Sequence, residues 1–210
     1  QVAAGQRRAA ERTLEKASRT LEPPQLEPVM AQGSELLGQF DDAERYFRAA
    51  VSGERINIAA ARNLASFLVR RGRLTAARDE LRRVIASTAD TPEAVSGRAW
   101  ARRTLAMLLS QSGGYRDMEE SLTLLDDNAT DGQLSADDLT LKIGILANRP
   151  EPANWRLAID LTEQLSKLQP LSNAHCIQRS QLLEKCGRWE DARNELVALV
   201  SRPDTPPAVQ

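Results

Sequence analysis

A spacing of 34 residues recurs along this chain and restricts what it can fold into. A glycine is followed five residues later by alanine, nine residues later by a large apolar residue, and twelve residues later by another apolar residue. Self-similarity at a fixed period of this length indicates a repeat architecture. The copies are Gly38, Ala43, Phe47 and Ala50; Gly72, Ala77, Leu81 and Val84; Gly187, Ala192, Leu196 and Leu199; and Gly5, Ala10, Leu14 and Ala17.

Two weaker copies fill the middle of the chain. The first keeps the spacing from Gly113 but has Met118 in place of the small alanine, and Leu122 and Leu125 follow it. The second keeps only its latter half, and a loop over residues 148–152 replaces its glycine turn. The middle of the chain therefore continues the same period in a degenerate form.

The spacing is that of two helices joined by a tight turn. Glycine adopts the positive φ that ends a helix, and alanine lets the next helix approach the first closely. The apolar residues that follow continue a stripe at helical spacing. Helix pairs with this period stack so that each covers its neighbour's apolar face. We therefore predict an all-α fold, a right-handed α-solenoid of about five helix-turn-helix pairs.

The pattern resembles the tetratricopeptide repeat family. The family consensus matches Leu64-Ala65, Leu68, Gly72, Ala77, Leu81 and Val84, and again Gly38, Ala43, Phe47 and Ala50. The resemblance implies one solenoid domain over residues 1–202. We expect a half repeat at 3–22, repeats at about 24–57, 58–91, 99–130, 135–170 and 172–202, and a tail or linker over 203–210. Because a half repeat follows Gln1, we expect the chain to begin within a longer array or protein.

Composition leaves little material for a catalytic or metal site. The chain has one histidine and two cysteines, and Cys176 and Cys186 lie too far apart for a CxxC pair. His175 beside Cys176 has no acidic partner, so we interpret both as ordinary helix residues. Trp100, Trp155 and Trp189 are expected to pack in the core. We predict no catalytic residues, no metal, no cofactor and no enzyme activity; the cysteine content is compatible with a reducing cytoplasm.

Charge is nearly balanced overall but unevenly distributed. The net charge is −1, yet residues 1–116 carry 19 Lys+Arg against 13 Asp+Glu, and residues 117–210 carry 9 against 16. This asymmetry favours an acidic partner, or head-to-tail self-association. The densest basic stretch, residues 70–83, has no interleaved aromatic residues, so we interpret it as a solvated turn and helix face rather than a nucleic-acid site. No run of apolar residues is long enough for a membrane span.

The resemblance also implies where a ligand binds, because the first helix of each pair lines the groove in this family. Counting back from the turn glycines gives Gln32 and Glu35 in the first full repeat. Arginine suits carboxylates, so an acidic peptide is the natural ligand. The alternative is a solvated face, because 24 of the 28 cations are arginine. The hypothetical groove set is Arg62, Asn63, Ser66, Arg70, Arg103 and Met107.

Two further functional hypotheses are compared with the peptide-binding one. The carboxylate clamp of co-chaperone members would fall on Pro28, Gln32, Asn63, Trp100 and Thr104, and only Asn63 agrees with it. A chaperone-tail clamp is therefore disfavoured. The other hypothesis is a structural or regulatory spacer, or a self-association segment, of a larger multidomain enzyme or regulator. The main prediction remains a non-catalytic protein-protein interaction module.

Overall fold

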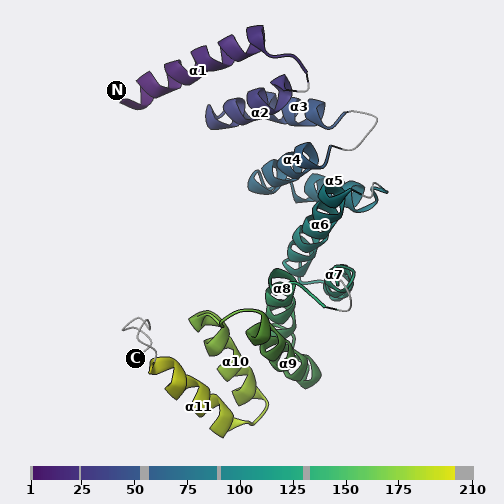
Figure 1. Cartoon of the computed structure of the whole chain (residues 1–210), viewed down its shortest axis with the longest axis vertical. Helices are drawn as coiled ribbons and strands as arrows, with labels where there is room; N and C mark the ends of the chain where they lie inside the picture. Colours follow the sequence, from purple (N-terminus) through teal and green to yellow (C-terminus); the bar gives the residue numbers. More distant parts are fainter. Residues whose placement is uncertain (1, 24, 53–56, 89–90, 130–132, 202–210) are drawn as a thin grey trace. The chain divides into compact units, whose positions relative to one another are not determined.

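Helices form most of the chain that the structure describes. The computed structural model describes residues 2–23, 25–52, 57–88, 91–129 and 133–201, and these ranges contain eleven α-helices and no β-strand. The predicted tail over 203–210 lies outside them. The helices, labelled in Figure 1, are α1 Val2–Thr20, α2 Leu26–Leu36, α3 Phe40–Ala50, α4 Ile58–Arg70, α5 Leu74–Ile85, α6 Pro92–Ser110, α7 Tyr115–Asp126, α8 Ala136–Ala147, α9 Pro152–Leu168, α10 Asn173–Lys185 and α11 Trp189–Val200.

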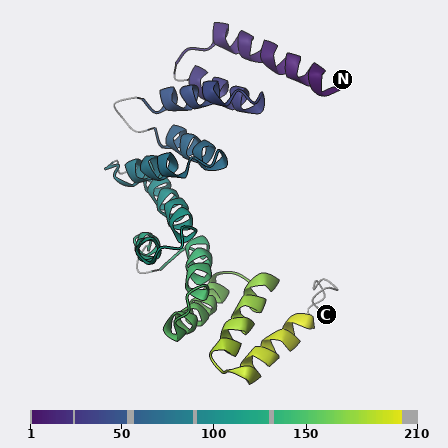
Figure 2. The same cartoon turned by 180° about the vertical axis from the view of Figure 1, so that it is seen from behind.

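The chain divides into two compact units, Gln1–Leu108 and Leu109–Gln210. In the first unit α2 packs on α3 and α4 on α5, while α1 contacts α2 and α3 contacts α4. In the second unit α8 packs on α9 and α10 on α11, and α9 contacts α10. The hairpin arrangement of these pairs is visible from both sides in Figures 1 and 2. The predicted all-α solenoid of helix pairs is confirmed.

Four glycines make the turns between paired helices, as predicted. Gly38, Gly72, Gly113 and Gly187 have φ values of 76°, 70°, 75° and 75°. In the α4–α5 turn the residue after the glycine, Arg73, donates its backbone N–H to the carbonyl of Leu68 at 2.9 Å. This bond closes the end of the first helix in the manner of a Schellman motif. Gly5 differs, because it lies inside α1 rather than at a turn.

The repeated apolar positions form the core of each unit. Phe47, Leu81 and Val84 are buried in the first unit, and Leu165 and Leu199 in the second. In the weaker copy that keeps only its latter half, the polar residue Thr162 takes one of the apolar positions. Its hydroxyl donates to the carbonyl of Ala158 at 2.8 Å, so the geometry is kept. Leu196, at the same repeat position as Phe47 and Leu81, is 42% exposed.

Arg149 occupies the turn between α8 and α9, where the other pairs have glycine. Its side chain is only 7% exposed and donates to Glu119 at 2.6 Å, with Glu151 at 3.5 Å. The guanidinium also lies over the ring of Tyr115, 5.2 Å from its centroid. The hydrogen bond with Glu119 raises the pKa of Arg149. This turn is thus held by side-chain contacts to α7 instead of by a glycine cap.

Candidate functional site

The four predicted residues of α4 lie on one side of that helix. Arg62, Ser66 and Arg70 are spaced four residues apart, so they form a row along the helix, and Asn63 lies beside it. Both arginines are exposed, while Ser66 and Asn63 are half-buried. The opposite side of α4 is apolar and buried; it comprises Ala61, Leu64, Ala65 and Leu68. Burial of that stripe directs the polar row outward.

Arg70 connects this row to α2. Its Nε and Nη2 donate to the two carboxylate oxygens of Glu35 at 2.9 and 2.8 Å. The pair spans 35 residues of sequence and joins the first helices of two consecutive pairs. Both residues were predicted to face the ligand, but the ion pair between them was not. Sequence spacing places each residue on its own helix, whereas the contact depends on how the two helices pack.

Arg62 connects the same row to α6. Its guanidinium lies over the ring of Trp100, 4.9 Å from the centroid. Trp100, Arg103 and Met107 are spaced three and four residues apart, so they share one side of α6. Met107 is exposed and Arg103 is half-buried. The residues of α2, α4 and α6 named so far form what we call the first-helix face: Glu35, Arg62, Asn63, Ser66, Arg70, Trp100, Arg103 and Met107.

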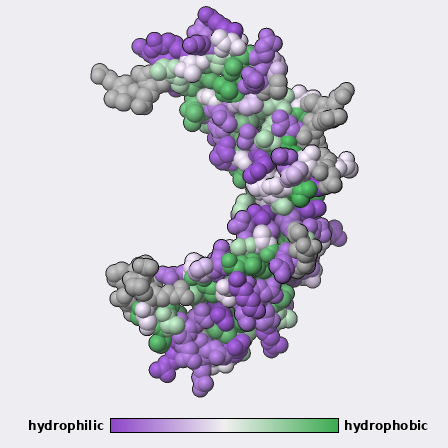
Figure 3. Space-filling view, viewed as in Figure 1, coloured by the Kyte–Doolittle hydropathy of each residue, from purple (hydrophilic) through white to green (hydrophobic). Residues whose placement is uncertain are grey.

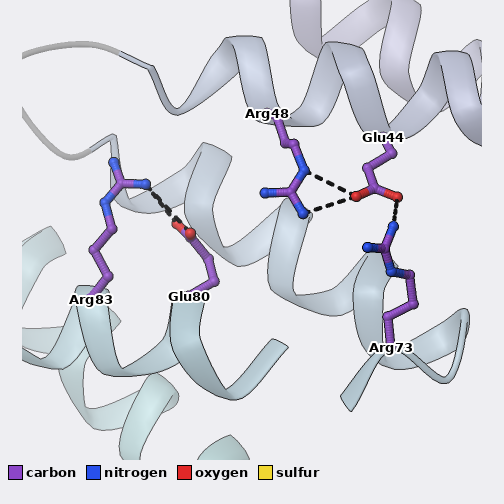
Figure 4. Close-up of polar contacts among 5 residues, drawn as sticks. All are labelled: Glu44, Arg48, Arg73, Glu80 and Arg83. Carbon is purple, nitrogen blue, oxygen red and sulfur yellow. Dashed lines mark hydrogen bonds and ion pairs between the residues drawn. The ribbon is translucent and has the colours of Figure 1, made fainter. Parts of the chain in front are cut away.

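The dense basic stretch over residues 70–83 serves the fold. Glu44 of α3 accepts a hydrogen bond from Nε of Arg48 at 3.0 Å and lies 2.9 Å from Nη2 of Arg48 in an ion pair (Figure 4). Glu44 also forms an ion pair with Arg73. Arg83 pairs with Glu80 in the same view and donates to the carbonyl of Val51 at 2.9 Å. The sequence predicted a solvated turn and helix face here. Arg71, Arg73 and Arg83 are exposed, in keeping with that expectation, and Arg73 and Arg83 also contact the preceding helix pair.

His175 lies at the start of α10. Cys176 is buried, and Nδ1 of His175 lies 3.0 Å from the hydroxyl of Ser172, which caps α10. Both cysteines are free thiols. Within the described ranges, no group of three or more His, Cys, Asp or Glu side chains could hold a metal ion. His175 therefore contacts the residue that caps the start of α10.

One tryptophan departs from the predicted core role. Trp100 and Trp155 are half-buried, and the indole of Trp155 donates to the carbonyl of Arg149 at 2.6 Å. Trp189 is 62% exposed, so the prediction of core packing is wrong for it. It lies at the start of α11, two residues after the turn glycine Gly187. A helix start at the same repeat position holds Phe40, which is also partly exposed.

The remaining surface is mostly hydrophilic. Figure 3 shows purple hydrophilic side chains over most of the visible surface, with smaller green hydrophobic areas among them. In the part of the chain that the structure describes, none of the helices has the length and apolar character needed to cross a bilayer.

Comparison with known proteins supports the architecture. Residues 36–101 match the family model described as tetratricopeptide repeat. No curated protein matches the chain. BtubC (BKLC) from P. vanneervenii has 16% identity and a TM-score of 0.62, covering 98% of this chain and 95% of its own.

Two other solved structures share the fold at similarly low identity. A tetratricopeptide repeat protein from Parabacteroides merdae ATCC 43184 has 18% identity and a TM-score of 0.61, covering 99% of this chain and 77% of its own. MamA from MSR-1 has 16% identity and a TM-score of 0.59, covering 83% and 92%. These similarities establish the fold of this chain and not its ligand.

Proposed function

The chain is a tetratricopeptide repeat protein, and we propose that it binds an extended, acidic segment of another protein on its first-helix face. Such repeats act in general as modules for protein-protein interaction. They are also generally non-catalytic scaffolds, and we propose the same for this chain. The acidic character of the ligand and its place on α4 and α6 are the specific parts of the proposal.

The arginine row of α4 carries the proposal. Arg62 rests on Trp100 and Arg70 on Glu35, so both guanidinium groups are held in defined positions before a ligand arrives. Such pre-organisation reduces the entropy that binding must remove. Arg62 and Arg70 bring two guanidinium groups to a face where the carboxylate of Glu35 pairs with Arg70. Ser66 lies between the two arginines of α4, where its small side chain leaves room for a ligand backbone.

The spacing of the row predicts the spacing of acidic residues in the ligand. Arg62 and Arg70 are eight residues apart on a helix, which separates them by about 12 Å. An extended chain covers about 13 Å in four residues. A segment with carboxylates at positions j and j+4 therefore matches both guanidinium groups. Bidentate pairing with Arg62 would fix its register, while Arg70, whose Nε and Nη2 pair with Glu35, offers its remaining N–H groups.

The test compares two double variants that remove the same charge. Arg62→Ala/Arg70→Ala changes the proposed face, whereas Arg19→Ala/Arg45→Ala removes two exposed arginines of α1 and α3. Fluorescence anisotropy measures binding of labelled acidic, neutral and basic peptides of equal length. We expect the acidic peptide to bind best and to lose at least about tenfold in affinity only in the first variant.

A pull-down from lysate, analysed by mass spectrometry, then identifies partners that the wild type captures and the first variant does not. Equal affinity of the acidic peptide for both double variants would remove the first-helix face from consideration. Preference for a basic or neutral peptide would refute the acidic ligand while leaving the architecture unaffected.

A further inference from the structure

The two arginines of α4 differ in how their charge is compensated. Arg70 pairs with both carboxylate oxygens of Glu35, at 2.9 and 2.8 Å, so a negative charge already lies beside it. Arg62 lies over the ring of Trp100, and no carboxylate of the described residues is within ion-pair distance of it. An aromatic ring carries no net charge, so the positive charge of Arg62 is left uncompensated.

Arg70 keeps hydrogen-bond donors for a ligand despite this ion pair. A guanidinium has five N–H donors, and Glu35 takes one from Nε and one from Nη2. These two atoms form one edge of the guanidinium, so Nη1 and the second hydrogen of Nη2 remain on the other edge. The Arg70 side chain is 54% exposed. A ligand anion can therefore reach Arg70, where it lies across the guanidinium from the carboxylate of Glu35.

The negative charge of Glu35 acts on only one of the two ligand positions. Arg62 and Arg70 are about 12 Å apart along α4. Interactions between exposed charges are largely screened beyond about 10 Å at an ionic strength of roughly 0.1 M. An anion at Arg70 is therefore attracted by Arg70 and repelled by Glu35, whereas an anion at Arg62 is mainly attracted.

A second negative charge on the ligand separates the two positions. A carboxylate carries one negative charge, whereas a phosphate monoester carries about −1.5 to −2 near neutral pH. At Arg62 the additional charge increases the attraction. At Arg70 the additional charge is also repelled by Glu35, and a phosphate loses more favourable hydration than a carboxylate when it binds. Phosphate is therefore favoured over carboxylate at Arg62 but not at Arg70.

We propose that Glu35 determines the specificity of the first-helix face, because it restricts the position at Arg70 to a single negative charge while Arg62 also accepts a phosphate. The ligand is accordingly an acidic segment whose binding is strengthened by phosphorylation of the residue that faces Arg62. Phosphorylation of the residue that faces Arg70 leaves binding unchanged. This inference rests on the proposed function, since it requires the acidic segment to lie along α4.

The test uses two fluorescein-labelled peptides with a common glycine–serine background. One has glutamate at two positions four residues apart, and the other has phosphoserine at both, so the direction of binding does not affect the result. Fluorescence anisotropy gives the affinity of each peptide for the full chain and its variants at about pH 8, where the phosphate is a dianion. The phosphate preference is the ratio of the two affinities.

Single variants isolate each position at the same net charge. Arg70→Ala leaves the position at Arg62, and Arg62→Ala leaves the position at Arg70 with its Glu35. The Arg62→Ala chain is then combined with Glu35→Gln or, as the matched control, with Glu15→Gln. The control removes an equal charge from an exposed ion pair of α1. Circular dichroism confirms that each variant is folded.

We expect the Arg70→Ala chain to bind the phosphopeptide about fivefold more tightly than the glutamate peptide. The Arg62→Ala chain should bind the two peptides within about twofold of each other, because Glu35 offsets the second charge. Glu35→Gln should raise the preference of that chain to about fivefold, and Glu15→Gln should leave it unchanged.

Two results would overturn this inference alone. One is an equal phosphate preference in the Arg62→Ala and Arg70→Ala chains. The other is a preference that Glu35→Gln does not change; a loss of affinity for both peptides alike would show that Glu35 only orients Arg70.

Failure of the proposed function has a different signature. The glutamate peptide would then not bind the wild type, or it would bind the Arg62→Ala/Arg70→Ala chain as tightly as the wild type. Either result would refute binding on the first-helix face and the role of Glu35 together.

Discussion

At the scale of single residues, arginine side chains join one helix to another through ion pairs and hydrogen bonds. Arg70 and Arg73 reach acidic residues of the preceding pair, and Arg83 caps the carbonyl of Val51 at the end of α3. The planar guanidinium suits this task, because it offers several donors in fixed directions. Lysine, which presents one flexible charge, is rare in the chain. The function of each arginine is therefore set by its neighbours rather than by its charge.

Arg149→Ala should lower the free energy of unfolding by about 1–3 kcal/mol, because it removes charged hydrogen bonds to a nearly buried guanidinium. The control is Arg188→Ala, which breaks an exposed ion pair with Asp191 and should cost less than about 1 kcal/mol. Urea unfolding followed by circular dichroism measures both. An equal loss in the two variants would mean that the contacts of Arg149 with Glu119 and Tyr115 contribute nothing beyond a surface pair.

Glu151 should make stability depend on pH. Its pKa is lowered, first by a hydrogen bond from its own backbone N–H and then by Asn154 and Arg149. A carboxylate whose pKa falls on folding stabilises the folded state above its unfolded pKa, and loses that effect as the pH falls through the folded pKa. Glu151→Gln should therefore be less stable than the wild type at neutral pH. Urea midpoints of the two proteins should converge in acid, and a constant difference would contradict this origin.

At the scale of elements, the glycine turns and the apolar stripes explain why this sequence forms helix pairs. Each turn glycine has a positive φ, which other residues adopt at a cost of about 1–2 kcal/mol. The apolar residues that follow the glycine bury one side of the second helix. That side packs against the first helix of the same pair and against the next pair. The turn and the stripe are local features, so both can be identified in the sequence.

Two glycine substitutions should have opposite effects on stability. Gly72 has φ +70° and Gly144 lies within α8, and neither has an atom within 4 Å of the place where a Cβ would lie. Gly72→Ala should therefore destabilise the fold by about 1–2 kcal/mol through backbone strain alone. Gly144→Ala should stabilise it by about 0.5–1 kcal/mol, because alanine favours the helix. Thermal unfolding measures both, and a shift in the same direction would contradict this account.

The sequence predicted the elements better than the contacts between them. The spacing from Gly38, Gly72, Gly113 and Gly187 placed the turns correctly, because a tight turn and an apolar stripe depend on residues close in sequence. It did not predict the Arg70–Glu35 pair or the exposure of Trp189. A long side chain finds its partner only after helices pack, and the exposure of a repeat position depends on whether another helix covers it.

At the scale of the whole molecule, a substitution in one helix pair should affect only that pair and the pairs beside it. Repeats of this kind contact only the pair before and the pair after them, so stability is a sum of local terms. The two compact units of this chain each have their own buried core. A change in one core should therefore have little effect on a distant helix pair.

Leu64→Ala tests this confinement. Leu64 is buried in α4, and its truncation should cost about 2–5 kcal/mol through lost packing and a cavity. Hydrogen exchange measured by mass spectrometry should become faster in α2 to α5 and stay unchanged in α9 to α11. Faster exchange along the whole chain would show that the units unfold as one.

Cations that lie over an aromatic ring of the preceding pair also have an evolutionary consequence. Identical repeats can be duplicated freely, since any copy fits beside any other. Here Phe40 is covered by Arg71, Tyr115 by Arg149 and Trp155 by Lys185, while Leu74 of α5 begins its helix without an aromatic ring. A duplicated pair would place a ring beside a neighbour that does not supply its cation. The pairs are therefore not interchangeable copies of one unit.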